Sequence, residues 1–316
     1  MASQWRSAHK PRRKLAALAH LEALEGRQLM AANAAQVGFQ EDASTGTNTL
    51  IITGTNKADV IRIDDNGTGA AGAITVTLGT GNVYTTKSAI AQIELVGKGG
   101  NDQVSYNLNG DLVSPRVVLV DLGDGNDKFT DNLNGAINST TGLDLEVYGD
   151  AGNDTMTTNQ AGATLQGNAV VYFQGDAGND TLSYNGTGLI AAGASFSPEF
   201  SGGAGNDTIR SNYSGVVNGY YMYNLTADGG AGNDNITANV HVGAGSTGSV
   251  GSSASTPAAV DGGAGNDTIR FAVNVDPAAT QNQVYAVAVG NTGKDVVTRT
   301  ANVTNDATND KSSLLS

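Results

Sequence analysis

The chain has 316 residues, of which 43 are glycine and none is cysteine, and its formal net charge is −13. The missing cysteine excludes disulfides, zinc-thiolate sites and cysteine nucleophiles, and three histidines are too few for a histidine-rich metal site. Glycine at about twice its usual frequency, without a three-residue period, excludes collagen and favours short strands joined by tight turns.

The charge is divided unevenly along the chain. Residues 1–30 contain six basic and two acidic side chains, so that the remainder contains 11 basic and 28 acidic ones. An acidic body repels nucleic acid and anionic lipid and attracts divalent cations. No apolar run approaches the roughly 18 residues that a membrane-spanning helix needs. We therefore expect no nucleic-acid partner and no membrane span.

Residues 1–32 combine a basic start, the short apolar run Leu15–Ala19 and small residues at the end, which is typical of an export signal. One histidine and two glutamates interrupt the apolar part. The sequence Leu-Glu-Ala-Leu-Glu-Gly-Arg-Gln-Leu-Met-Ala over 21–31 resembles the N-terminal export segment of many planctomycete extracellular proteins. We expect an export leader over 1–32 and a secreted or cell-surface protein. A basic amphipathic helix that caps the fold is the alternative.

Residues 37–96 predict an irregular β segment that caps the N-terminal end of the array described next. This segment contains Gly54-Thr-Asn-Lys-Ala-Asp59-Val-Ile61, which is a degenerate copy of the repeat phrase below. The copy lacks the glycine at the fourth position and the asparagine at the fifth. We interpret it as a degenerate first coil.

One six-residue phrase recurs seven times in residues 97–275, with glycine always fourth and Asn-Asp always last. An apolar side chain follows each aspartate by two residues, and successive aspartates are 25 to 33 positions apart, most often 27. The aspartates are Asp102, Asp127, Asp154, Asp180, Asp207, Asp234 and Asp267. The apolar residues are Val104, Phe129, Met156, Leu182, Ile209, Ile236 and Ile269.

Strand-like runs with period-two alternation flank each phrase, for example Arg116–Leu122 before one phrase and Thr268–Val273 after another. A unit of about 27 residues cannot bury its own apolar face, so the units must stack. We predict an all-β, right-handed parallel β-helix or β-roll solenoid with about 27 residues per coil. The apolar residues two after each aspartate then point inward, and so do Tyr106, Tyr184 and Phe271, which we assign to the core.

Residues 276–316 predict closing strands, including Val284–Val289, and a polar tail after about 303. The longest spacing between aspartates contains Gly243–Pro257, a stretch rich in glycine, serine, threonine and alanine without any ordering signal. We expect that stretch to form a loop.

The phrase matches Gly-Gly-x-Gly-x-Asp-x-apolar-x and so resembles the hemolysin-type, or repeats-in-toxin, calcium-binding repeats over 97–275. The resemblance implies calcium ions between coils, held by the seven aspartates and by turn carbonyls. The implied carbonyl ligands include those of Gly97, Gly149, Gly175, Gly202, Gly229 and Gly262. One phrase occurs per coil, whereas the family usually repeats every nine residues, so calcium is expected on one edge only. Leu122 at the first position and Lys98, Asp150 and Asp176 at the second depart from the pattern and predict weaker or empty sites.

Electrostatics gives an independent reason for a cation. Stacking places the aspartates in a column about 4.8 Å apart. Neighbouring carboxylates at that distance repel by roughly 1 kcal/mol at the dielectric constant of water and by roughly 3 kcal/mol at an effective value of 20. Calcium accepts hard oxygen ligands in flexible geometry, whereas magnesium demands a tighter octahedron. The alternative is a tight Asn-Asp turn that binds no ion.

We predict a secreted calcium-binding repeat protein with a structural or adhesive role at the cell surface or in a matrix, with cell-surface polysaccharide as a possible partner, and no enzymatic activity. Two alternatives are a lyase-like carbohydrate-active β-helix and a toxin-related protein that a type I system exports. Catalytic motifs of the hydrolase, zinc-protease and phosphate-loop types are absent from the sequence. We interpret His241 as a polar strand residue, and Arg210 and Arg270 as surface charges that flank the acidic edge.

Overall fold

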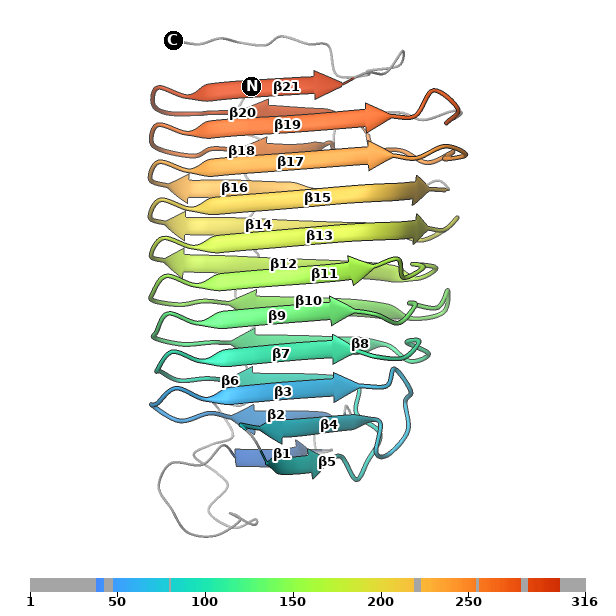
Figure 1. Cartoon of the computed structure of the whole chain (residues 1–316), viewed down its shortest axis with the longest axis vertical. Coiled ribbons are helices and arrows are strands. Elements are labelled where there is room, and N and C mark those ends of the chain that lie inside the picture. Colours follow the sequence, from blue (N-terminus) through green and yellow to red (C-terminus); the bar gives the residue numbers. More distant parts are fainter. Residues whose placement is uncertain are drawn as a thin grey trace.

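The computed structural model describes residues 38–42, 48–79, 81–218, 223–253, 256–279 and 284–301, and every regular element in them is a β-strand. The expected leader over 1–32 and the polar tail after about 303 lie outside these residues. The strands form two sheets that face each other and extend along the length of the molecule (Figure 1). The prediction of an all-β chain is therefore confirmed.

The first sheet, sheet A, has ten strands. In spatial order they are β1 (Gly38–Asp42), β2 (Thr49–Thr53), β6 (Gln92–Val96), β8 (Arg116–Asp121), β10 (Gly142–Tyr148), β12 (Asn168–Ala177), β14 (Phe196–Ala204), β16 (Thr226–Ala231), β18 (Ala258–Asp261) and β20 (Ala286–Val289).

The second sheet, sheet B, has eleven strands. In spatial order they are β21 (Val296–Ala301), β19 (Thr268–Val275), β17 (Asn235–Val242), β15 (Thr208–Val217), β13 (Thr181–Ile190), β11 (Thr155–Ala161), β9 (Lys128–Leu133), β7 (Gln103–Leu108), β3 (Val60–Asp65), β4 (Ile74–Leu78) and β5 (Asn82–Thr85).

The chain alternates between the two sheets, so that each coil contains a phrase, a strand of sheet B, a loop and a strand of sheet A. Neighbouring strands of successive coils pair in parallel, as β11 pairs with β13 and β10 with β12. Equivalent positions in consecutive coils are paired, for example Met156 with Leu182. This pairing shows that each unit is about 27 residues long. The predicted parallel β-solenoid is confirmed.

Side chains from both sheets fill the space between them. The seven apolar residues that follow the aspartates by two positions are at most 2% exposed and form one inward column. Tyr106, Tyr184 and Phe271 are fully buried, which confirms their assignment to the core. From sheet A, Phe173 packs against Phe129 and Phe200, with ring centroids 5.9 Å apart in each pair. Burying an apolar side chain of this size contributes roughly 1.5–3 kcal/mol, so the core is the main source of stability.

The N-terminal end differs from the array because its strands reverse. β1 pairs with β2 antiparallel, and β3, β4 and β5 form an antiparallel meander that extends sheet B. β2 and β3 also pair in parallel with β6 and β7, so this region continues both sheets of the solenoid. Strand reversal ends the parallel stack at this end of the molecule, which is one way to limit edge-to-edge association.

The long spacing before Asp267 is more ordered than the sequence indicated. Val250 forms parallel bridges with Tyr223 and Val284 and is 1% exposed. The buried Ser246 hydroxyl accepts a hydrogen bond from the Val217 backbone N–H and donates one to the Gly243 carbonyl. The expected loop lies between β17 and β18, and Val250 within it stacks on the neighbouring coils.

Candidate metal-binding edge

The glycine at the fourth position of the phrase is required by both conformation and packing. Its φ lies between 112° and 157° in all seven copies, a region that L side chains rarely adopt. A Cβ placed on Gly152 would lie 1.4 Å from the Gly125 carbonyl oxygen of the preceding coil, and on Gly178 it would lie 1.6 Å from that of Gly152. Successive turns can therefore stack at strand spacing only when this position lacks a side chain.

The second position of the phrase is also left-handed. Four copies have glycine there, for example Gly203 with φ 103°. The other three have Lys98 with φ 81°, and Asp150 and Asp176 with φ 69° each. Lys98, Asp150 and Asp176 therefore adopt the same left-handed backbone conformation as the glycines, which costs them some backbone strain.

The asparagine at the fifth position connects each coil to the next. Its Oδ1 accepts a hydrogen bond from the backbone N–H of the asparagine in the following coil, for example Asn179 from Asn206 at 2.7 Å and Asn206 from Asn233 at 2.8 Å. The series begins at Asn101 and ends with the N–H of Lys294, which donates to Asn266. These side chains are exposed, so they form an outer ladder along the edge.

The aspartate at the sixth position bonds in the opposite direction, because it accepts a hydrogen bond from the preceding coil. Its Oδ1 accepts a hydrogen bond from the backbone N–H of the previous aspartate, for example Asp180 from Asp154 and Asp207 from Asp180, both at 2.7 Å. The series runs from Asp59 N–H, bonded to Asp102, to Asp267 N–H, bonded to Asp295. The seven predicted ligands are thus brought into one column, which we call the aspartate ladder.

The second oxygen of each ladder aspartate has no hydrogen-bond partner among the described residues. This holds for Oδ2 of all seven aspartates of the phrase, whose residues are only 1–2% exposed. An unsatisfied carboxylate oxygen in a buried position carries a large desolvation penalty. The same oxygen lacks a partner in all seven coils, so a cation or a proton at each level would offset this penalty.

Burial raises the pKa of these carboxyls. The pKa of Asp154 rises to about 7 because of desolvation, with the charges of Asp180, Asp127 and Asp176 adding to the rise. Desolvation also raises the pKa of Asp234 to about 7, with Asp207 adding to it. For four others the pKa rises to about 6 and desolvation is again the largest cause; these are Asp102, Asp127, Asp180 and Asp207. Near neutral pH, positive charge or protons therefore stabilise the column.

The first-position glycine brings a backbone oxygen to the same place. A Cβ on Gly149 would lie 2.4 Å from Asp154 Oδ2 and 2.7 Å from the Gly175 carbonyl oxygen of the next coil. The equivalent distances at Gly202 are 2.4 Å to Asp207 Oδ2 and 2.4 Å to the Gly229 carbonyl oxygen. A carboxylate oxygen and a carbonyl oxygen from adjacent coils therefore converge on one glycine. Such hard oxygen donors are those that calcium prefers, so the residues present fit this ion chemically.

Side chains alone would not complete such a site. Within the described residues, no three histidine, aspartate or glutamate side chains cluster closely enough to hold a metal ion. Any bound ion would therefore depend on turn carbonyls and water in addition to the aspartates. Asp176, at a second position, lies close enough to Asp154 and Asp180 to raise the pKa of both.

The two ends of the ladder contain aspartates outside the seven copies. Asp59 of the degenerate copy donates its backbone N–H to Asp102, but its own Oδ2 accepts a hydrogen bond from the Thr55 N–H at 2.7 Å. At the other end, the sequence analysis missed Gly290-Asn-Thr-Gly-Lys-Asp295-Val-Val297, in which Asp295 accepts from Asp267. The signal was present in the glycines at positions one and four and in the aspartate, but lysine replaces the asparagine.

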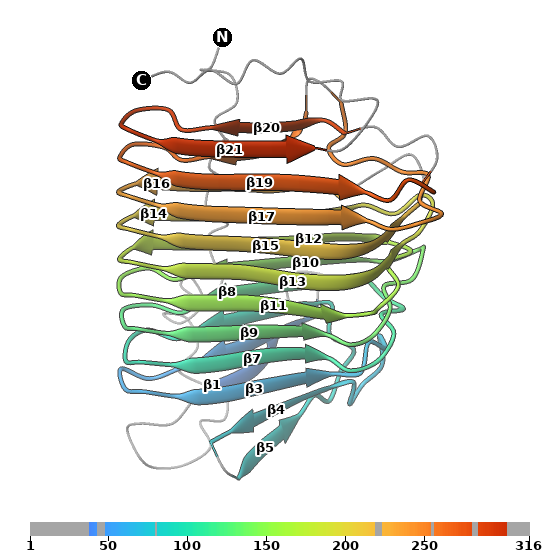
Figure 2. The ribbon, with the colours of Figure 1, turned by 45° about the horizontal axis from the view of Figure 1, so that its top comes forward.

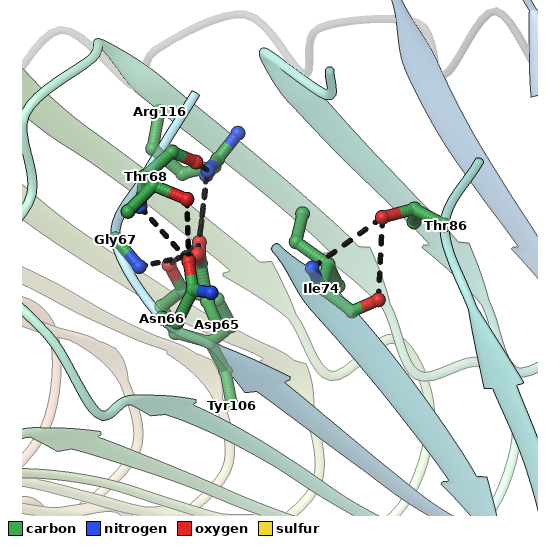
Figure 3. A network of polar contacts seen from close by, with 8 residues as sticks. All are labelled: Asp65, Asn66, Gly67, Thr68, Ile74, Thr86, Tyr106 and Arg116. Carbon is green, nitrogen blue, oxygen red and sulfur yellow. Dashed lines mark hydrogen bonds and ion pairs between the residues drawn. The ribbon is translucent and has the colours of Figure 1, made fainter. Parts of the chain in front are cut away.

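Another buried carboxylate, that of Asp65, lies in a network of polar contacts near the N-terminal end (Figure 3). Asp65 accepts hydrogen bonds from the Arg116 guanidinium at 2.7 Å, from the Tyr106 hydroxyl at 2.9 Å and from the Gly67 N–H at 2.8 Å. Asp65 and Arg116 are both fully buried. Asp65 is therefore a structural carboxylate whose charge is compensated by the protein itself.

Asp131, in β9, is fully buried without such compensation. Neither of its carboxyl oxygens has a hydrogen-bond partner among the described residues. Desolvation raises its pKa well above the usual range, and the hydroxyl of Thr158, its partner in β11, offsets this only in part. Burial therefore favours the protonated form of Asp131.

The described part of the chain contains no helix with the length and apolarity that crossing a bilayer would require. Comparison of the chain with protein-family models, with curated proteins and with solved structures found no match.

Proposed function

We propose that the protein is a calcium-binding structural repeat protein in which ions placed between coils stabilise the solenoid. The proposal rests on one observation: seven buried aspartates, one per coil, each have one oxygen without a hydrogen-bond partner. The resemblance of the phrase to calcium-binding repeats supports the same interpretation from the sequence.

The residues that would hold calcium are the seven ladder aspartates, through Oδ2, and the first-position residues, through their carbonyl oxygens. Bound calcium would supply positive charge to a column of carboxylates that repel one another. The aspartates already have Oδ1 in hydrogen bonds to the preceding coil, for example Asp127 with the Asp102 N–H at 2.6 Å. Their side chains are therefore held in place before an ion arrives, which lowers the entropic cost of binding.

The proposed setting is outside the cell, as a secreted or cell-surface protein with a structural or adhesive role. Extracellular calcium-binding modules typically have dissociation constants of about 0.1–1 mM. An ion at 100 times its dissociation constant stabilises a fold by roughly 2.7 kcal/mol per independent site. Several sites of this kind would make the rigidity of the solenoid depend on the medium.

Calcium uptake by the full chain is the direct test. Equilibrium dialysis against millimolar calcium should show several ions per chain, and circular dichroism should show a lower melting temperature in EGTA that added calcium restores. Uptake of no ion, with a melting temperature that calcium does not change, would reject the proposal.

Two substitutions separate a metal site from a purely structural turn. Asp180→Asn retains an oxygen that can accept the Asp154 N–H but removes the charge. We expect it to reduce calcium uptake and calcium-dependent stabilisation. Asp124→Asn removes the same charge from an exposed third position of the phrase and should change both much less. If Asp180→Asn takes up as much calcium as the wild type, the aspartate ladder is only a structural turn.

A further inference from the structure

Four neighbouring strands of sheet B contain no acidic residue, and neither do the strands β11 and β21 on either side of them. The four strands are β13, β15, β17 and β19 (Figure 2). The whole chain has 30 aspartates and glutamates, but these strands add no negative charge to the outer face of sheet B. The outward positions of these strands are occupied mainly by threonine, serine and asparagine.

An open hollow of about 380 Å³ lies on this surface. Glycines at Gly186, Gly188 and Gly215 interrupt β13 and β15 here, and Gly188 has a φ of 133°. Glycine within a strand commonly marks a bend. Figure 2 shows the C-terminal parts of β13 and β15 curving at this end of the sheet. The curvature explains why the outer face is hollowed at this place.

The hollow presents neutral hydrogen-bonding groups at the repeat of the coils. One row contains Asn185, Asn212 and Asn239 and a second contains Thr187, Ser214 and His241, one residue of each row per strand. Asn212 Nδ2 donates to Asn185 Oδ1 at 3.2 Å, and Asn239 Nδ2 donates to Asn212 Oδ1 at 3.0 Å. The row continues in the other direction through Asn159 of β11, whereas Asn239 is its last member and lies beside Ala272 of β19. A ligand can therefore bind the Oδ1 of Asn239.

Two arginines stand beside the hollow. Arg210 and Arg270 lie two residues before Asn212 and Ala272, on the same face as the asparagines, and are both exposed. Neither makes an ion pair or hydrogen bond with another described residue. They belong to β15 and β19, which are two strands apart, so their backbones are separated by about 10 Å.

We propose that this face binds a linear acidic polysaccharide whose chain lies across β13–β19, along the axis of the solenoid. Sugar hydroxyls would exchange hydrogen bonds with the amide and hydroxyl rows. Carboxylate or sulfate groups would pair with the two arginine guanidinium groups, which suit planar or tetrahedral oxyanions. The inference deepens the adhesive part of the proposed function and rests on it, but it does not require calcium at the aspartate ladder.

The test is isothermal titration calorimetry of the full chain with oligogalacturonates of about six sugars, at low and high salt. The double variant Arg210→Gln and Arg270→Gln should bind roughly tenfold more weakly, because it loses charge-assisted hydrogen bonds. Ser214→Trp should abolish binding by filling the hollow. The matched controls are Lys128→Gln and Thr130→Trp, which alter the same face at β9, outside the hollow, and should bind like the wild type.

Three outcomes would overturn the proposal. They are the absence of oligogalacturonate binding by the wild type, equal affinity of the double arginine variant, and equal binding of a neutral oligogalactan. A single-stranded oligonucleotide of similar charge should compete poorly, and effective competition would show unspecific polyanion attraction instead. Circular dichroism of each variant establishes folding, and dialysis measures calcium uptake separately. Failure of this site and failure of calcium binding are therefore distinguishable.

Discussion

The N-terminal coil and the repeat array both contain buried aspartates, but the partners of the two carboxylate oxygens differ between the two regions. In the N-terminal coil, Asp65 has its charge compensated by Arg116, and Asp59 has its Oδ2 bonded to the Thr55 N–H. In the array, every ladder aspartate has Oδ1 bonded to the previous coil and Oδ2 without a partner among the described residues. In the N-terminal coil the carboxylates are thus compensated within the protein, whereas in the array one oxygen of each carboxylate is left without a partner among the described residues.

This difference shows where an added cation would act. A carboxylate whose charge is already compensated gains little from calcium, whereas a column of uncompensated carboxylates gains at every level. Calcium removal should therefore weaken the array and leave the N-terminal coil comparatively stable. The comparison can be tested by variants that affect one region and not the other.

The largest effect is expected at the fourth-position glycine. Gly152→Ala places a Cβ 1.4 Å from the Gly125 carbonyl oxygen at a φ of 144°, which no side-chain movement can relieve. Backbone strain and overpacking together should lower the free energy of unfolding by about 3–6 kcal/mol. Denaturant unfolding measures the loss. Gly81→Ala, in the N-terminal region with open space around it, is the control; an equal loss there would contradict the packing explanation.

Arg116→Met should be nearly as damaging but for an electrostatic reason. It leaves Asp65 buried without its cation, which typically costs about 3–5 kcal/mol. Calcium uptake by the ladder should not change, because Asp65 is not part of it. The exposed pair of Arg62 with Asp64 provides the control, since Arg62→Met should cost less than about 1 kcal/mol. Loss of calcium sites in Arg116→Met would show that the two regions are not independent.

The pH dependence of stability should be opposite in sign to ordinary acid denaturation. The pKa of Asp154 and Asp234 rises to about 7 in the folded chain, above that of an unfolded aspartate. Stability from such groups is complete below the unfolded pKa and decreases as the pH rises through the folded pKa. Without calcium, the melting temperature should therefore be higher at pH 5 than at pH 8. Calcium should bind more weakly at pH 5 because protons compete for the same oxygens. A calcium-free melting temperature that falls toward pH 5 would contradict this.

The smallest effect is expected from Asp131→Asn in the core. The substitution removes the cost of burying an ionisable group, so it should raise the melting temperature at pH 8 and make little difference at pH 5. A scan at both pH values measures the difference. At the surface, desolvation raises the pKa of Asp64, but hydrogen bonds and the charge of Arg62 together lower it below the usual value. Asp64→Asn should therefore destabilise slightly at pH 8.

The solenoid could be predicted because its determinants are periodic. The apolar residues two positions after each aspartate, such as Leu182 and Ile209, specify the inward column, and the glycines specify the turns. The reciprocal Asn and Asp contacts could not be predicted, since they depend on which neighbouring coil each side chain faces. The residues around Asp131 give no sign that its side chain is buried. A polar residue that points inward differs from one that points outward only in its position within the alternation of the strand.

The C-terminal end of the array was missed in the sequence, and the hollow on sheet B could not be predicted from it. Asp295 was missed because Lys294 replaces the asparagine of the phrase, although the backbone N–H of Lys294 still donates to Asn266. The hollow depends on strand curvature and on rows of side chains contributed by several coils. Such rows are far apart in sequence and become adjacent only through stacking.

The paired contacts between coils make each junction independent of coil length. Asn101 accepts from Asn126 while Asp127 accepts from Asp102, and the same exchange links Asn233 and Asp234 with Asn266 and Asp267 across a coil six residues longer than the usual one. Insertions on the opposite side of a coil therefore leave this edge intact. The gene could consequently lengthen or shorten by duplication or deletion of whole units, and a designer could change the length of the protein in the same way.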